Sequence, residues 1–239
     1  MKAFLYSFIL QWKLDIRDKA VFFTYYAIPL AFFLVMGSIF SSILPDSKET
    51  LIPSMTIFSV SMGAITGSPS ILVEVYGSEI KKSYQVGHIP LSIVAIVNFL
   101  SACMHSFITS MIIYVVAPLL FHAIPPQNSL LYFLQLFIFI CASLLIGTSL
   151  GLLIKKSSQL TMCSQIIFLP SIMLSGIMFP ASMLPTFLQS VGKMFPATWC
   201  YEMMKDASIK LDLLVPIFII ALVCIGICVV QLKRLTQRT

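Results

Sequence analysis

The sequence contains few charged residues, and they are unevenly distributed. Only 10% of its 239 residues are Asp, Glu, Lys or Arg, whereas soluble domains carry about 25%. Between Lys82 and Lys155 there are 72 consecutive residues without any of the four. A soluble domain cannot leave so long a stretch uncharged, because part of it must face water. The composition therefore excludes an ordinary soluble fold and indicates a membrane protein.

Motifs for metal binding, catalysis and nucleic-acid recognition are also missing. There is no CxxC or HExxH motif and no His/Cys cluster with metal-ligand spacing. A basic patch with interleaved aromatics, as nucleic-acid binding requires, is absent as well. Most cysteines lie in apolar stretches, where cysteine behaves as a small hydrophobic residue; these are Cys103, Cys141, Cys163, Cys224 and Cys228. We therefore expect no metal, no cofactor on this chain, no nucleic-acid partner and no enzymatic activity.

The uncharged stretches are long enough to cross a membrane six times. A helix needs about 20 apolar residues to span a hydrocarbon core of roughly 30 Å. The Leu/Ile/Phe-rich runs lack the alternation of barrel strands, so helices are expected. We predict an all-α integral membrane protein, one domain over 1–239, with six transmembrane helices. The predicted spans are 21–43, 52–73, 92–119, 130–154, 159–179 and 213–232.

The distribution of basic residues predicts the orientation. Six spans place both termini on the same side of the membrane, together with the loops after the second and fourth spans. That side carries eleven of the 15 Lys and Arg residues. The other side carries Lys48, Lys193, Lys205 and Lys210. Because cytoplasmic loops are enriched in Lys and Arg, both termini are expected in the cytoplasm.

The first nineteen residues predict an interfacial helix before the first span. Aromatic and apolar residues recur every four positions, while polar residues fall elsewhere on the helix. The apolar series is Phe4, Phe8, Trp12 and Ile16. This pattern suits a helix that lies along the inner membrane surface with its aromatic side among the lipid head groups. The alternative is a cytoplasmic extension of the first span.

Residues 74–90 join the second and third spans and predict a short cytoplasmic helix. Gly77 and Gly87 bracket the segment as helix breakers. Between them, Ile80 and Tyr84 share one side of the helix, and the charged residues Glu79, Lys81 and Lys82 surround them. A short charged helix held between two spans suits the transmission of force from a soluble partner. The alternative is an ordinary polar connector.

Residues 180–210 predict a helical hairpin at the outer side, between the fifth and sixth spans. The segment is too apolar for a solvated loop, but Pro180, Pro185 and Pro196 prevent one continuous helix. Trp199 favours the head-group level. We expect two short helices in the outer leaflet, or alternatively an amphipathic cap on its surface. Cys200 lies in this segment and is expected to react from outside with membrane-impermeant thiol reagents, but slowly if the hairpin buries it.

Polar residues within the spans are few. Asn98 and His105 are seven residues apart and therefore share a helix face, which Thr109 extends. They form either the lining of a translocation path or hydrogen bonds to a neighbouring helix, and the second role is favoured. No Asp, Glu, Lys or Arg lies deep in a predicted span. This argues against an ion-coupled carrier, which needs such groups, and favours an amphipathic or lipid-like cargo.

Two segments carry a resemblance to a known family. These are Glu74-x-x-Gly77-x-Glu79 with Gly87 and Pro90, and the run SGIMFPASMLP…FPATWCYEMM over residues 175–204. With the order of the predicted helices, they make the chain resemble the membrane subunits of ABC-2 type ATP-binding-cassette exporters. Many relatives open the first segment with an Arg-Glu pair, whereas Val73 precedes Glu74 here. The resemblance covers essentially the whole chain.

The resemblance implies half of an exporter in a bacterial plasma membrane. Such a subunit pairs with a second copy of itself or a sister permease and is surrounded by membrane lipid. A separate ATPase subunit would bind ATP and Mg²⁺, and this chain has no GxxxxGK[ST] phosphate loop. The residues implied in coupling to it are Glu74, Gly77, Glu79, Lys81, Lys82, Tyr84 and Gly87. The cargo would be a drug, peptide antibiotic or lipid-like molecule. An ion-coupled transporter and a non-transporting anchor for an ATPase remain alternatives.

Overall fold

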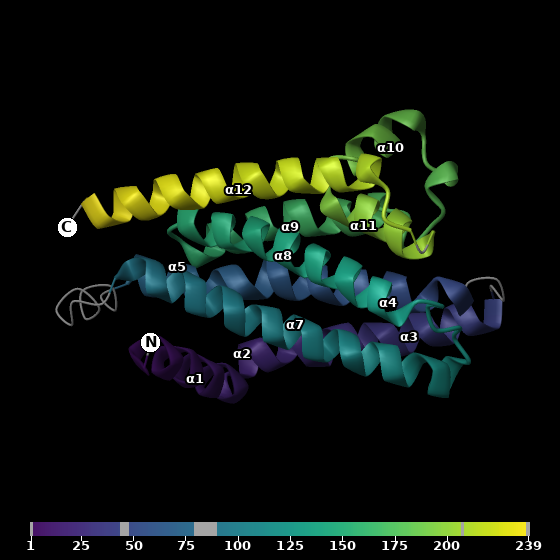
Figure 1. The fold of residues 1–239 in the computed structure, drawn as a ribbon, viewed down its shortest axis with the longest axis horizontal. Coiled ribbons are helices and arrows are strands. Elements are labelled where there is room, and N and C mark those ends of the chain that lie inside the picture. Colours follow the sequence, from purple (N-terminus) through teal and green to yellow (C-terminus); the bar gives the residue numbers. More distant parts are fainter. Residues whose placement is uncertain (1, 44–47, 79–89, 207, 238–239) are drawn as a thin grey trace.

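The computed structural model describes residues 2–43, 48–78, 90–206 and 208–237. All regular structure within these ranges is helical (Figure 1). In chain order the elements are α1 (Lys2–Arg17), α2 (Lys19–Phe22), η1 (Phe23–Ala27), α3 (Ile28–Ile43), α4 (Leu51–Met62), η3 (Gly63–Gly67), α5 (Ser68–Gly77), α7 (Leu91–Phe121), α8 (Ser129–Leu153), α9 (Ser157–Leu174), η4 (Ala181–Met183), α10 (Thr186–Gly192), α11 (Pro196–Lys205) and α12 (Leu211–Gln237).

The long helices run side by side along one axis. Both termini lie at one end of this bundle, and α10 and α11 lie at the opposite end (Figure 1). Five helices in the described part of the chain are long and apolar enough to cross a membrane. They are Lys19–Ser42, Leu51–Gly77, Ser92–Phe121, Ser129–Leu153 and Leu211–Leu235. The prediction of an all-α, multi-pass membrane protein is therefore confirmed.

The predicted fifth span, 159–179, corresponds to α9, which is not one of those five helices. It packs beside α5, α8 and η3, but its first half carries polar Ser, Thr and Gln side chains. The helix also ends at Leu174, before the predicted boundary. Gly176 has a φ of 87°, a left-handed conformation that commonly terminates helices. The described structure thus gives five helices that are apolar enough to cross a membrane, and the predicted fifth span, α9, is a shorter and more polar helix beside them.

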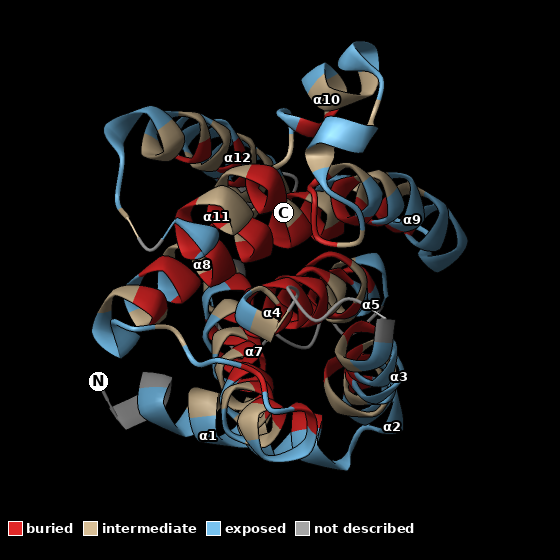
Figure 2. Cartoon of the chain, turned by 90° about the vertical axis from the view of Figure 1, so that its right-hand side faces the viewer, coloured by how far each residue is buried: buried red, intermediate tan, exposed pale blue. Residues whose placement is uncertain are grey.

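The helix formed by α4, η3 and α5 occupies the centre of the bundle. In its most apolar window 78% of the residues are buried, compared with 17% for α12. Figure 2 shows α4 enclosed by neighbouring helices, with exposed residues on the outward sides of α3, α9 and α12. In a membrane, such exposed apolar sides face lipid, whereas the central helix contacts mostly protein.

Two π-helical turns meet inside the bundle, and each precedes a proline. The segment η1 ends two residues before Pro29, and η3 ends two residues before Pro69. Proline has no N–H to donate to the carbonyl four residues earlier, so the regular α-helical ladder is interrupted there. The Tyr25 ring lies against Gly63 and Gly67, where an added Cβ would stand 2.6 Å and 2.9 Å from ring atoms. Only glycine permits this contact.

The helix α8 approaches the central helix through a Gly-x-x-x-Gly pair. A Cβ at Gly147 would lie 1.9 Å from the Ala64 carbonyl oxygen, and one at Gly151 would lie 2.9 Å from the Pro69 carbonyl oxygen. Small residues at this spacing allow two helix backbones to come close in a membrane, where packing replaces the hydrophobic effect as the driving force. The two glycines therefore set the distance between α8 and the central helix.

The outer segment folds back onto the bundle. The prolines Pro180 and Pro185 precede η4 and α10, and Pro196 opens α11. The Trp199 Nε1–H donates to the Lys193 carbonyl at 2.8 Å. From α8, Gln135 donates to the carbonyls of Met203 (3.0 Å) and Ser208 (3.2 Å). As a result, α11 is inserted among α4, α8, α9 and α12.

The structure buries Cys200, which is the case in which slow labelling was expected. Its side chain faces the bundle and has 0% exposure. Burial raises the pKa of the Cys200 thiol, which further lowers the fraction of the reactive thiolate. The prediction placed the cysteine on the outer side of the membrane, but the sequence pattern did not reveal which face of α11 would be covered.

We predict that Gly147→Leu destabilises the protein by at least about 3 kcal/mol, the upper end of overpacking costs. The reason is that the clash is with backbone and cannot be relieved by a side-chain rotation. Gly226→Leu is the matched control, because no atom lies within 4 Å of a Cβ built there. Thermal unfolding in mild detergent checks both variants. Equal melting temperatures would contradict the close approach of α8 to η3.

We predict that Cys200 reacts with a membrane-impermeant maleimide roughly tenfold or more slowly than an exposed cysteine. A Ser190→Cys, Cys200→Ala variant provides the exposed comparison, since Ser190 lies on an exposed position of α10. Labelling rates in sealed vesicles before and after denaturation check the prediction. Fast labelling of Cys200 in the folded protein would show that α11 does not pack into the bundle.

Candidate functional site

A buried polar face runs along the inner half of α7. Asn98, His105 and Thr109 share this face as expected, and each has an exposure of 2% or less. The Asn98 amide donates to the Ser68 carbonyl at 3.1 Å, and the Thr109 hydroxyl donates to the Tyr25 carbonyl at 2.8 Å. Two of the three side chains therefore hydrogen-bond the backbone of neighbouring helices, which is the structural role favoured from the sequence.

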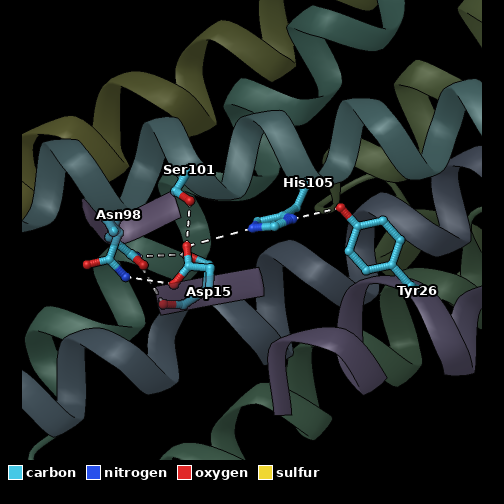
Figure 3. Close-up of polar contacts among 7 residues, drawn as sticks. Asp15, Tyr26, Asn98, Ser101 and His105 are labelled. Carbon is cyan, nitrogen blue, oxygen red and sulfur yellow. Dashed lines mark hydrogen bonds and ion pairs between the residues drawn. The ribbon is translucent and has the colours of Figure 1, made fainter. Parts of the chain in front are cut away.

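The carboxylate of Asp15, on α1, reaches the same face. Its exposure is only 4%, and Figure 3 shows it directed at Ser101 and His105 of α7. It accepts hydrogen bonds from the Ser101 hydroxyl and, at 2.7 Å, from the Gln11 amide. The neighbouring Ile16, which was assigned to the lipid-facing apolar series, is 60% exposed. The side of α1 that faces the bundle thus carries Asp15 together with Trp12 of the apolar series, and α1 is attached through a buried acid.

The imidazole of His105 is held between α1 and the first span. Its Nδ1 lies 2.7 Å from the Tyr26 hydroxyl, and its ring stacks on Trp12 with centroids 4.4 Å apart (Figure 3 shows the Tyr26 contact). Its Nε2 is buried without a hydrogen-bond partner and lies 3.8 Å from Asp15 Oδ2. That distance is too long for a hydrogen bond. The imidazole is therefore oriented by the hydrogen bond at Nδ1, whereas its Nε2 has no hydrogen bond in the described structure.

A cavity of about 370 Å³ opens beside this pair. Its walls come from α1, α2, η1, α3 and α7; they include Trp12, Asp15, Phe22, Tyr26, Ala27 and His105. The charged residues Arg17, Asp18 and Lys19 mark the start of the first span. Tyr26 follows Lys19 by seven residues, which is about 10 Å along a helix. The cavity therefore lies near the end of the first apolar helix that carries these charged residues.

Sequence reasoning singled out His105 but not its partners. The sequence pattern placed Asp15 only outside the apolar series of the first helix, and it did not distinguish Tyr26 and Ser101 from other span residues. One signal was available, since Trp12 and Asp15 are three residues apart and therefore neighbours on a helix. An acid beside an aromatic on an otherwise apolar helix indicates a face that meets protein.

The coupling residues are only partly within the described structure. Glu74 is exposed near the end of α5. Gly77 is the last residue of that helix, and a Cβ built on it would lie 3.0 Å from the Lys155 carbonyl oxygen. The other members of the set lie outside the described residues: Glu79, Lys81, Lys82, Tyr84 and Gly87. Their role stays a prediction.

The comparison with protein families gives one match. A family model described as ABC-2 type transporter matches residues 2–207, which extend from α1 to just past α11. None of the curated proteins that were compared matches the chain. The described residues contain no group of three or more His, Cys, Asp or Glu side chains placed to hold a metal ion.

We predict that Tyr26→Phe destabilises the folded protein by about 1 kcal/mol, the typical net value of one hydrogen bond. The variant leaves both ring nitrogens of the buried His105 without a partner in the described structure. Tyr6→Phe is the control, because Tyr6 is 69% exposed. Thermal unfolding of both purified variants checks this. An unchanged melting temperature for Tyr26→Phe would mean that His105 is not held through Nδ1.

Proposed function

Because the chain belongs to the ABC-2 type transporter family, we propose that it is the membrane subunit of an exporter driven by a separate ATPase. The match over residues 2–207 carries this proposal, because it includes the α1 helix, the first five passes and the outer segment together. Membership of this family makes the chain a permease of an ATP-binding-cassette transporter and a multi-pass membrane protein.

The energy for transport would come from a partner subunit that binds ATP and Mg²⁺. The chain itself has no GxxxxGK[ST] loop to hold nucleotide phosphates. The ATPase would dock at residues 74–90, between α5 and α7. Both helices reach the end of the bundle where the two termini lie (Figure 1), and the exposed Glu74 is on that side. The family supports such a partner.

The orientation and assembly follow the same reasoning. We place both termini in the cytoplasm of a bacterial cell, since the end of the bundle that carries them holds most of the Lys and Arg residues. Six passes, with α9 counted as the fifth, form half of the usual exporter. The second half would be another copy of this chain or a sister permease.

The cargo proposed is amphipathic or hydrophobic, such as a drug, a peptide antibiotic or a lipid-like molecule. The apolar stretches contain no Asp, Glu, Lys or Arg deep in a span, so a strongly charged small solute has no matching groups within the membrane. We place the cavity beside Asp15 at the head-group level, where an amphipathic molecule from the inner leaflet would arrive.

One observation favours an ion-coupled transporter instead. A buried acid and a histidine next to each other in a membrane protein are the type of group that relays protons, and Asp15 and His105 are 3.8 Å apart. Transport that continues when the ATPase partner cannot hydrolyse ATP would favour this alternative. Docking of an ATPase without any movement of cargo would favour the anchor role.

We predict that gentle purification of this subunit yields a stoichiometric ATPase with a phosphate loop, and that Glu79→Lys reduces its yield about tenfold or more. A reversed charge at an interface costs several kcal/mol. Glu49→Lys is the matched control, because Glu49 is exposed and lies at the opposite end of the bundle. Its position there follows from the adjacent Lys48, whose carbonyl accepts a hydrogen bond from the Ile124 N–H in the loop after α7. Quantitative mass spectrometry of the co-purified proteins gives the result.

Equal recovery of the ATPase from both variants would contradict the docking site at 74–90. Recovery of the subunit alone, under conditions that preserve other transporter complexes, would contradict the proposed dependence on an ATPase.

A further inference from the structure

We propose that the cavity between α1, the first span and α7 binds the ammonium head of an amphipathic cation taken from the inner leaflet. The proposal deepens the proposed function, and it depends on that function in one respect: the bound cation is the cargo. The binding site itself needs only the residues of this chain.

The Asp15 carboxylate lines the cavity without a lysine or arginine beside it in the described part of the chain. Asp15 is 4% exposed and lines the cavity. The described residues place no lysine or arginine within ion-pair distance of its carboxylate; the ionic neighbour given by the structure is His105. A buried carboxylate without an opposite charge is costly, by several kcal/mol. A bound cation would remove that cost, and the site is therefore suited to one.

His105 does not satisfy the carboxylate. Its Nε2 stands 3.8 Å from Asp15 Oδ2, without a hydrogen bond to it or to any other described group. Its Nδ1 is engaged by the Tyr26 hydroxyl at 2.7 Å. The two hydrogen bonds that Asp15 accepts come from the neutral donors Gln11 and Ser101. Neither of these donors brings a positive charge to the acid.

The walls suit an ammonium group attached to an apolar body. The rings of Trp12, Phe22 and Tyr26 line the cavity, and aromatic faces attract quaternary and primary ammonium ions. At the rim, Phe22 is 55% exposed and Ile16 is 60% exposed, so apolar side chains lead from the lipid to the Asp15 carboxylate. The volume of about 370 Å³ lies within the range of small-molecule sites, roughly 300–1,000 Å³.

The same arrangement disfavours other head groups. An anionic head would meet the Asp15 carboxylate in a poorly solvated site, where repulsion between like charges is strong. A neutral head would leave the carboxylate uncompensated. The positive charge is therefore the distinguishing chemical property, and it can belong either to a lipophilic amine or to the head group of an aminophospholipid.

The purified subunit contains its own probe for this site. Trp12 lines the cavity, and the sequence has only two tryptophans, so Trp199→Phe leaves Trp12 as the sole emitter. In this background, in bilayers of phosphatidylglycerol, brominated dodecyltrimethylammonium should quench Trp12 with saturation. Asp15→Asn should weaken that binding about tenfold, the effect of losing one favourable charge interaction. Brominated dodecyl maltoside, which is neutral, should quench equally in both proteins.

A variant that keeps the charges intact separates binding from folding. Ala27→Phe fills the cavity from η1 without altering Asp15 or His105, and it should abolish saturable quenching. Ala31→Phe is its matched control, since Ala31 lies one helical turn further on and is exposed. Equal cation affinity in Asp15→Asn and its parent, or in Ala27→Phe and Ala31→Phe, would overturn the proposal.

Two further arms identify the source of the cation and test its link to transport. Brominated phosphatidylethanolamine that quenches Trp12 in an Asp15-dependent way assigns the site to a lipid head group; competition by dodecyltrimethylammonium alone assigns it to a lipophilic amine. Because these measurements need no ATPase, they test the site by itself. If the site binds cations but the assembled transporter moves none of them, the cargo role is overturned, whereas the binding site itself stands.

Discussion

The contact between two π-helical turns determines much of this bundle. Pro29 and Pro69 each remove an N–H that an α-helix would use, and a wide turn precedes each proline. The two turns meet where the Tyr25 ring lies on Gly63 and Gly67. The Tyr25 carbonyl, which Pro29 cannot bond, accepts the Thr109 hydroxyl instead. A local defect in hydrogen bonding thereby connects the first span, the central helix and α7.

The candidate site is built directly on this contact. His105 is one turn from Thr109 on α7, and its ring lies 5.4 Å from that of Tyr25. The next residue, Tyr26, bonds the histidine, and the histidine faces Asp15 of α1. Movement of α1 must therefore displace groups that also contact α7 and the first apolar helix. This is a physical route by which an event at the inner surface, such as the arrival of a cation, would reach the bundle.

Much of the fold follows from the sequence because charge is so costly in a lipid environment. Five of the predicted spans agree with the apolar helices to within a few residues, and the shared face of Asn98, His105 and Thr109 follows from helical geometry alone. The predicted fifth span does not appear among these apolar helices, because α9 carries polar residues in its first half and ends before the turn at Gly176. The coupling helix lies outside the described residues.

The sequence by itself determined that the chain is helical, lies in a membrane and crosses it several times, since these properties depend on the local cost of exposing charge or backbone to lipid. Only the tertiary structure decided which side of each helix meets protein. Periodicity placed Asp15 outside the apolar series of the first helix, and it did not show which face of α11 carries Cys200; the structure buries both side chains. In a membrane, an apolar face packs equally well against lipid or protein, so the sequence pattern does not reveal which of the two it meets. A buried acid, by contrast, requires specific hydrogen-bond donors, and only the folded chain brings these together.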